Sequence, residues 1–107
     1  VLPILYMTTK LFTYGLLQVP RIQRQLFKRN VRQEKHSLPG FSISEKLVNE
    51  MYKTITPDCD SFVDGTVLYL EDGELAITDR FEGVASGLYE RIKTYDDMEV
   101  YIAGGIL

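Results

Sequence analysis

The chain has 107 residues, of which 45% are hydrophobic and 25% charged, and its net charge at pH 7 is −3. This length and composition are typical of one globular domain and exclude a wholly disordered chain. The single cysteine, Cys59, excludes an internal disulfide, and no uninterrupted apolar run reaches the roughly 20 residues needed to cross a bilayer.

The charge is distributed unevenly along the chain. Residues 1–36 contain seven basic residues and one acidic residue, a net charge of +6, whereas residues 37–107 contain five basic and fourteen acidic residues, a net charge of −9. Such asymmetry indicates a basic segment that binds an anionic surface, which is a membrane, a nucleic acid or a protein. We therefore divide the chain into an N-terminal helical arm, 1–36, and an α+β body, 37–107.

Two helices are predicted in the arm. The first begins near Lys10 and is kinked or ended by Pro20, because proline lacks the amide donor. The second covers residues 21–35, where an arc of basic side chains lies opposite an apolar face at 100° per residue. This pattern is that of a basic amphipathic helix, and its side chains are the predicted partner-binding residues. They are Arg21, Arg24, Lys28, Arg29, Arg32 and Lys35 on the basic side, and Ile22, Leu26, Phe27 and Val31 on the apolar side.

The body begins with a predicted helix and a predicted hairpin region. Ser42 and Glu45 have the spacing of a capping box, which predicts a helix over residues 42–55. The pairs Asp64-Gly65 and Asp72-Gly73 enclose the apolar run 66–71, and Asp-Gly between apolar runs is typical of a tight hairpin turn. These signals predict a three-stranded meander, in which residues 66–71 form the middle strand.

One further helix and one further strand complete the chain. Asp79 and Glu82 again have capping-box spacing, followed by an apolar stripe, which predicts a helix over residues 79–93. The sequence of residues 98–103 predicts the last strand. The expected fold class is α+β, in which a sheet of about four strands, the meander plus the C-terminal strand, packs against helices and carries the basic amphipathic arm.

Acidic residues around the first Asp-Gly pair have part of a calcium-loop pattern. Counted from Asp60, acidic side chains stand at positions 1 and 5, glycine at position 6 and Glu71 at position 12. Phe62, however, occupies a position that needs an oxygen ligand, and turn chemistry accounts for the glycines. Asp60, Asp64 and Glu71 are thus candidate metal ligands, but the hairpin interpretation is favoured. No metal, cofactor or catalytic residue is expected.

These patterns favour a non-catalytic structural or assembly subunit of a larger complex, which docks through the basic helix onto a partner chain or a membrane surface. The opposite charges of arm and body favour other protein subunits as partners, including copies of the chain that associate head-to-tail. Peripheral membrane contact is a further expectation. Nucleic acid is not expected, because no aromatic lies among the basic side chains to stack on bases. The alternative is a small ligand- or metal-binding domain or enzyme that uses the acidic cluster Asp58–Asp64.

Overall fold

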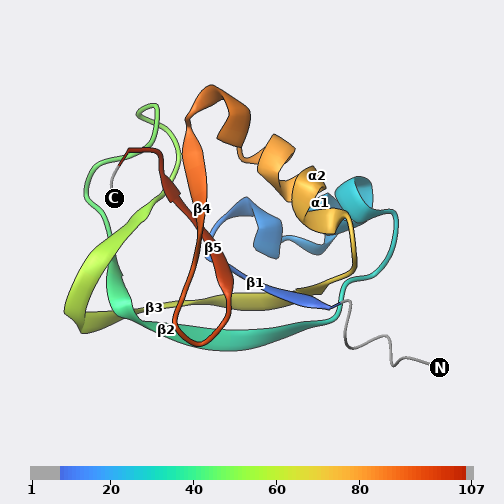
Figure 1. The fold of residues 1–107 in the computed structure, drawn as a ribbon, viewed down its shortest axis with the longest axis horizontal. Helices are drawn as coiled ribbons and strands as arrows, with labels where there is room; N and C mark the ends of the chain where they lie inside the picture. The colour runs from blue at the N-terminus through green and yellow to red at the C-terminus, as the bar shows by residue number, and fades with distance from the viewer. Residues whose placement is uncertain (1–7, 106–107) are drawn as a thin grey trace.

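The computed structural model describes residues 8–105, which form a five-stranded mixed sheet with two short α-helices (Figure 1). In chain order the elements are β1 (Thr9–Thr13), η2 (Leu16–Gln18), α1 (Pro20–Phe27), β2 (Gln33–Ile43), β3 (Ile55–Leu70), α2 (Glu74–Phe81), η3 (Val84–Ser86), β4 (Tyr89–Lys93) and β5 (Glu99–Ala103). The strand order is β2-β3-β1-β5-β4. β1 runs antiparallel to β3 and parallel to β5, and the outer strands β2 and β4 are antiparallel to their neighbours.

The central strand of the sheet is β1. Its Leu11 packs in one hydrophobic cluster with Phe27 of α1, and its Phe12 packs in another with Val100 of β5. The sequence of β1, Thr-Lys-Leu-Phe-Thr, has two adjacent apolar residues and no alternation, so periodicity alone does not distinguish it from part of a helix. The helix predicted near Lys10 is therefore wrong, and the segment assigned to an arm supplies the centre of the sheet.

The basic amphipathic helix is shorter than predicted. α1 ends at Phe27, because Lys28 takes a left-handed conformation with φ 59° while its amide donates to the carbonyl of Arg24. The chain then enters β2, so Arg32 and Lys35 lie outside the helix. The predicted fold class, with its N-terminal helical arm, is wrong: the molecule is a five-stranded mixed sheet with only two short α-helices.

The helix predicted over residues 42–55 is a strand end and a loop. Ile43 of β2 pairs with Ile55 of β3, and the amide of Ser44 donates to the carbonyl of Thr54 at 2.9 Å. Ile55 is fully buried, so cross-strand pairing and burial override the capping-box spacing. The loop folds back on itself where Val48 and Tyr52 pair.

The first Asp-Gly pair does not form a turn. β3 is a single strand of 16 residues that passes through Gly65. A Cβ atom at Gly65 would lie 2.4 Å from the carbonyl oxygen of Thr13 and 2.7 Å from Cζ of Phe12, so glycine permits the close approach of β1. β3 ends at Leu70, and Gly73, with φ 85°, is the N-cap of α2 and not part of a hairpin turn. The predicted three-stranded meander is wrong for these two reasons.

The C-terminal part of the chain contains one predicted element and lacks another. α2 begins at Glu74 and ends at Phe81, and β4 follows from Tyr89, so the helix predicted over residues 79–93 is wrong. The last strand, predicted over residues 98–103, is present as β5. α1 and α2 lie on the same side of the molecule in Figure 1. Across residues 8–105, the longest helices are too short to traverse a lipid bilayer.

Candidate active site

The turn after β1 forms one wall of the candidate site. Gly15 precedes η2, whose first internal hydrogen bond runs from the amide of Gln18 to the carbonyl of Gly15 at 3.1 Å. The amides of Leu16 and Leu17 come before that bond, as the first amides of any helical turn do, and have no acceptor within η2. Tyr14, just before the turn, is buried and its hydroxyl donates to the carbonyl of Tyr101 at 2.5 Å.

Glu82 stands at the end of α2. Its amide donates to the carbonyl of Thr78 at 2.9 Å, and Gly83, with φ 71°, turns the chain away from the helix axis. Burial raises the pKa of the Glu82 carboxyl to about 7. The position at the negative end of the helix dipole acts in the same direction. The carboxyl group is therefore divided between its protonated and ionised forms at neutral pH.

Glu82 and Tyr14 line one cavity of about 710 Å³. This volume lies within the roughly 300–1,000 Å³ of small-molecule sites. The lining comes from β1 and η2, the loop before β3, the end of α2, the start of β4 and Tyr101 of β5. A partly buried carboxyl with a raised pKa in a cavity of this size is a candidate general acid or base.

The loop before β3 is tied to β4 at this cavity. The hydroxyl of Tyr89 donates to the carbonyl of Lys53 at 2.5 Å. Burial, followed by the negative charge of Glu82, raises the pKa of Tyr89 to about 12. Tyr89 is thus neutral at physiological pH and acts as a hydrogen-bond donor. Among the lining residues that the structure describes, Lys53 is the one lysine, and no arginine is among them.

A polar network holds α2 against the sheet next to the cavity. Tyr101 donates to Asp79 Oδ1 at 2.6 Å, and Arg91 Nε donates to the same oxygen at 2.8 Å. Arg91 also pairs with the buried Glu99. The hydrogen bond from Arg91 holds the pKa of Asp79 below its usual value. This network fixes the last turn of α2, which Glu82 follows.

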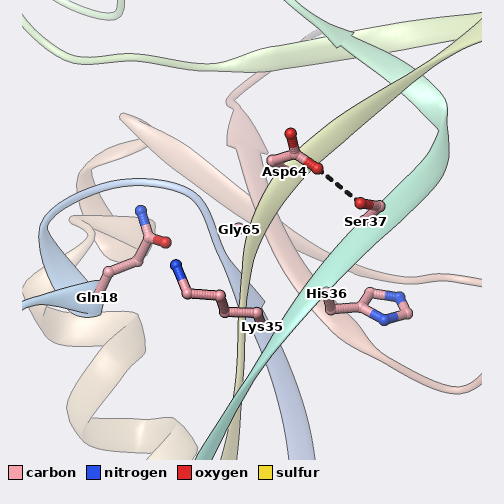
Figure 2. Close-up of a pocket in the computed structure, with 6 residues that line it drawn as sticks. All are labelled: Gln18, Lys35, His36, Ser37, Asp64 and Gly65. Carbon is pink, nitrogen blue, oxygen red and sulfur yellow. Dashed lines mark hydrogen bonds between the residues drawn. The ribbon is translucent and has the colours of Figure 1, made fainter.

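A second cavity, of about 550 Å³, lies between η2, β2 and β3 (Figure 2). Ser37 Oγ donates a hydrogen bond to Asp64 Oδ1 there at 2.6 Å. In Figure 2 the side chains of Lys35 and His36 point in opposite directions from β2. Lys35, Ser37 and Asp64 are exposed. The charges of Lys35 and Asp64 are therefore hydrated.

The predicted partner-binding residues divide between core and surface. Phe27 and Val31 are buried in the cluster below α1, and Ile22 and Leu26 pack against it, so the apolar side is largely covered by the domain itself. Arg29 Nη2 lies 2.6 Å from Glu74 Oε1. The remaining basic residues are exposed, namely Arg21, Arg24, Lys28, Arg32 and Lys35. Their binding to a partner stays a prediction.

The candidate metal ligands do not converge. Asp64 accepts a hydrogen bond from Ser37 on β2, and Glu71 lies 3.5 Å from Arg29 Nε, measured to its Oε2. Asp60 is exposed on β3. In the part of the chain that the structure describes, no three His, Cys, Asp or Glu side chains are grouped to hold a metal ion.

The sequence reasoning missed Glu82, Tyr14 and Tyr89. The spacing of Asp79 and Glu82 indicated the start of a helix, whereas the structure places Glu82 at a helix end. Burial of a carboxyl group, which causes its raised pKa, leaves no local signal in a sequence. The Tyr14-Gly15 pair directly after a buried strand is the signal that could have indicated a binding turn.

Comparison with known proteins gives a family and a fold. Residues 11–104 match the model of a family described as gamma-glutamyl cyclotransferase, AIG2-like. No curated protein sequence matches the chain significantly. A solution structure of an Arabidopsis thaliana protein aligns with a TM-score of 0.74 at 24% identity, covering 90% of this chain and 62% of that one. The chain thus spans less than two thirds of the length of this relative.

Two further structures have the same fold. A second Arabidopsis thaliana protein, also solved in solution, aligns with a TM-score of 0.70 at 22% identity, over 94% of this chain and 72% of that one. The crystal structure of an uncharacterized Homo sapiens protein aligns with a TM-score of 0.74 at 19% identity, over 94% and 69% respectively.

These findings overturn the functional prediction. A family of cyclotransferases is a family of enzyme type, so the prediction of a non-catalytic structural subunit that docks through an amphipathic helix is wrong. The alternative, a small ligand-binding domain or enzyme, agrees better with the family and the fold. The cavity that contains Glu82 is not lined by the acidic cluster Asp58–Asp64 on which that alternative relied.

Proposed function

The chain belongs to the gamma-glutamyl cyclotransferase, AIG2-like family, and on that premise we propose that it cyclises the γ-glutamyl group of a small amide. In this reaction the α-amine of the γ-glutamyl group attacks its own γ-carbonyl carbon. A five-membered lactam, 5-oxoproline, forms, and the amine that was bound to the γ-carbonyl leaves. The reaction consumes no water and needs no external reductant or oxidant.

Glu82 is the group that carries this proposal. The α-amine of a γ-glutamyl compound is an ammonium ion at neutral pH and attacks only after it loses a proton. A carboxylate with a pKa of about 7 is a suitable base, because it is ionised in a large fraction of molecules and still holds a proton well. The same proton can then be given to the nitrogen of the breaking amide bond, which leaves Glu82 ionised for the next turnover. The second proton that the attacking nitrogen loses passes to the released amine, which leaves as an ammonium ion.

Other lining groups supply binding and orientation. The η2 turn presents backbone amides, which suit the oxyanion that develops on the γ-carbonyl oxygen or the α-carboxylate. Lys53 offers a positive charge to a carboxylate of the substrate. Tyr14 and Tyr89 donate their hydroxyl hydrogens to backbone carbonyls, so they shape the cavity while the base remains Glu82.

The test is formation of 5-oxoproline from γ-glutamyl amides by the purified chain and by Glu82→Gln. Loss of a general base lowers kcat by roughly 10²- to 10⁴-fold, and this loss is the expected result. Glu45→Gln is the control, because Glu45 is exposed and lies outside the cavity. Equal activity of Glu82→Gln and the parent chain would contradict the proposal.

A further inference from the structure

The mouth of the Glu82 cavity is apolar. Single exposed apolar side chains are common on protein surfaces, but contiguous ones indicate a binding site. Ten large hydrophobic residues among those described are exposed, and six of the ten line this cavity. The six, which we call the apolar rim, are Leu16, Val19, Met51, Tyr52, Phe81 and Leu88.

Four separate parts of the chain build the apolar rim, and one of them is Leu88, just before β4. Leu16 comes from η2, Met51 from the loop before β3 and Phe81 from the end of α2. Met51 is 68% exposed and Leu16 54% exposed, although both belong to ordered turns held by backbone hydrogen bonds. Such exposure of apolar surface is unfavourable in the free protein, and a ligand that covers it gains the corresponding free energy.

The size of the cavity leaves room for more than the γ-glutamyl group. At roughly 30 Å³ for each non-hydrogen atom, the share of one water molecule in the liquid, about nine such atoms of a γ-glutamyl group fill about 270 Å³. The cavity measures about 710 Å³. More than half of it therefore remains for the amine part of the substrate.

The charges of the lining limit what that amine part is. Lys53 is the basic side chain that the described lining offers, and the α-carboxylate common to every γ-glutamyl compound competes for it. A second carboxylate, on the amine part, would have to lie among the apolar rim without a cationic side chain of its own.

We infer that the substrate is a γ-glutamyl amide of an apolar, uncharged amine, whose hydrocarbon part packs against the apolar rim. The inference rests on the proposed cyclotransferase function and specifies its substrate class. The rim selects the amine, while Glu82 and the η2 turn act on the γ-glutamyl part, which all such substrates share.

The test compares three conjugates that differ in the amine alone: γ-glutamylphenethylamine, γ-glutamylphenylalanine and γ-glutamylglycine. Phenylalanine is phenethylamine with an added carboxylate, so this pair isolates charge, and glycine lacks the aromatic group. For the full chain, kcat/KM measured by release of 5-oxoproline should be at least about tenfold higher for γ-glutamylphenethylamine than for either other conjugate.

Variants connect the preference to the rim. Met51→Gln keeps the length of the side chain and should lower the preference for γ-glutamylphenethylamine by about fourfold, the equivalent of one buried methylene. Phe62→Gln is the matched control, because Phe62 is also exposed but lies outside the cavity, and it should keep the preference.

The outcomes separate the two proposals. Cyclisation of all three conjugates with equal kcat/KM would overturn the inference and leave the cyclotransferase function standing. A preference that Met51→Gln does not alter would also overturn it. No 5-oxoproline from any conjugate would contradict the proposed function, and the inference with it.

Discussion

The hydroxyl of Tyr101 on β5 donates a hydrogen bond of 2.6 Å to Asp79 Oδ1, three residues before Glu82. Thr78 Oγ1 lies 2.7 Å from the same hydroxyl oxygen, so this group joins the sheet to the last turn of α2. Tyr101, which also lines the cavity, thus ties α2 to the sheet just before Glu82, the proposed general base.

Tyr101→Phe should weaken this attachment. A hydrogen bond to a charged group contributes about 1.5–3 kcal/mol, so the free energy of unfolding, measured by urea denaturation, should fall by that amount. Tyr95→Phe is the control, because Tyr95 is 92% exposed and its loss should change stability by no more than about 0.5 kcal/mol. Equal stability of the two variants would show that the bond to Asp79 contributes nothing.

Glu82→Gln should stabilise the protein at alkaline pH. The pKa of Glu82 is raised from 4.5 to about 7, so the folded state holds this proton more tightly than the unfolded state does. The contribution of this carboxyl to the free energy of unfolding is therefore lost as the pH rises from about 4.5 to about 7. The loss is complete above that range. The upper limit is about 3 kcal/mol.

The measurement is urea denaturation of the parent chain and Glu82→Gln at pH 4 and pH 8. The variant should be more stable at pH 8 and gain no such advantage at pH 4. Glu45→Gln should show no comparable pH-dependent gain. A gain of equal size at both pH values would indicate that the carboxyl is not responsible.

Gly65→Ala should destabilise the sheet. The added methyl group would lie 2.4 Å from the carbonyl oxygen of Thr13, and this backbone atom can move only if β1 and β3 separate. Overpacking of this kind costs about 1–3 kcal/mol of unfolding free energy. Asp60→Ala, at an exposed position of the same strand, is the control for thermal denaturation. No loss from Gly65→Ala would mean that β1 and β3 are not in such close contact.

Arg29→Gln should cost more stability than Arg32→Gln. Arg29 forms a bidentate ion pair with Glu74, with 2.9 Å between Nε and Oε2 and 2.6 Å between Nη2 and Oε1. Glu74 is buried. Removal of one partner leaves a buried charge, which costs about 3–5 kcal/mol at most. Arg32 pairs with Glu34 in an exposed position, where such pairs contribute about 0–1 kcal/mol.

Urea denaturation of the two variants distinguishes an integrated N-terminal segment from a loosely attached one. Equal, small losses would mean that Arg29 does not hold this segment to α2. The pairing of Arg29 with Glu74 also shows that part of the charge complementarity noted between residues 1–36 and 37–107 is satisfied within one chain.

Local sequence signals predicted those elements that local chemistry determines. The strand predicted over residues 98–103 is present as β5, and Gly73 lies in the turn between β3 and α2. The chain from Thr9 to Thr13 could not be assigned in this way, because its two apolar residues, Leu11 and Phe12, are adjacent and pack in different clusters, which leaves no strand period.

The candidate site depends on contacts between distant parts of the chain. The raised pKa of Glu82 results from its burial, and Tyr14, Lys53 and Tyr89 come together only through the order of strands in the sheet. Gly65 was assigned to a turn because Asp-Gly is a turn signal, whereas its role is to admit a neighbouring strand. The charge asymmetry of the sequence is satisfied in part by the ion pair of Arg29 with Glu74, and the other basic residues of the predicted helix are exposed.

The most direct test of the account is a titration of the Glu82 carboxyl, followed by the ¹³C chemical shifts of glutamate side chains and compared with the pH profile of kcat/KM for a γ-glutamyl amide. Both should have a midpoint near pH 7, with activity rising as the carboxyl ionises, since burial raises its pKa to about 7. A Glu82 carboxyl that titrates near its ordinary value of 4.5, or a rate that does not follow its ionisation, would contradict the assignment of Glu82 as the general base.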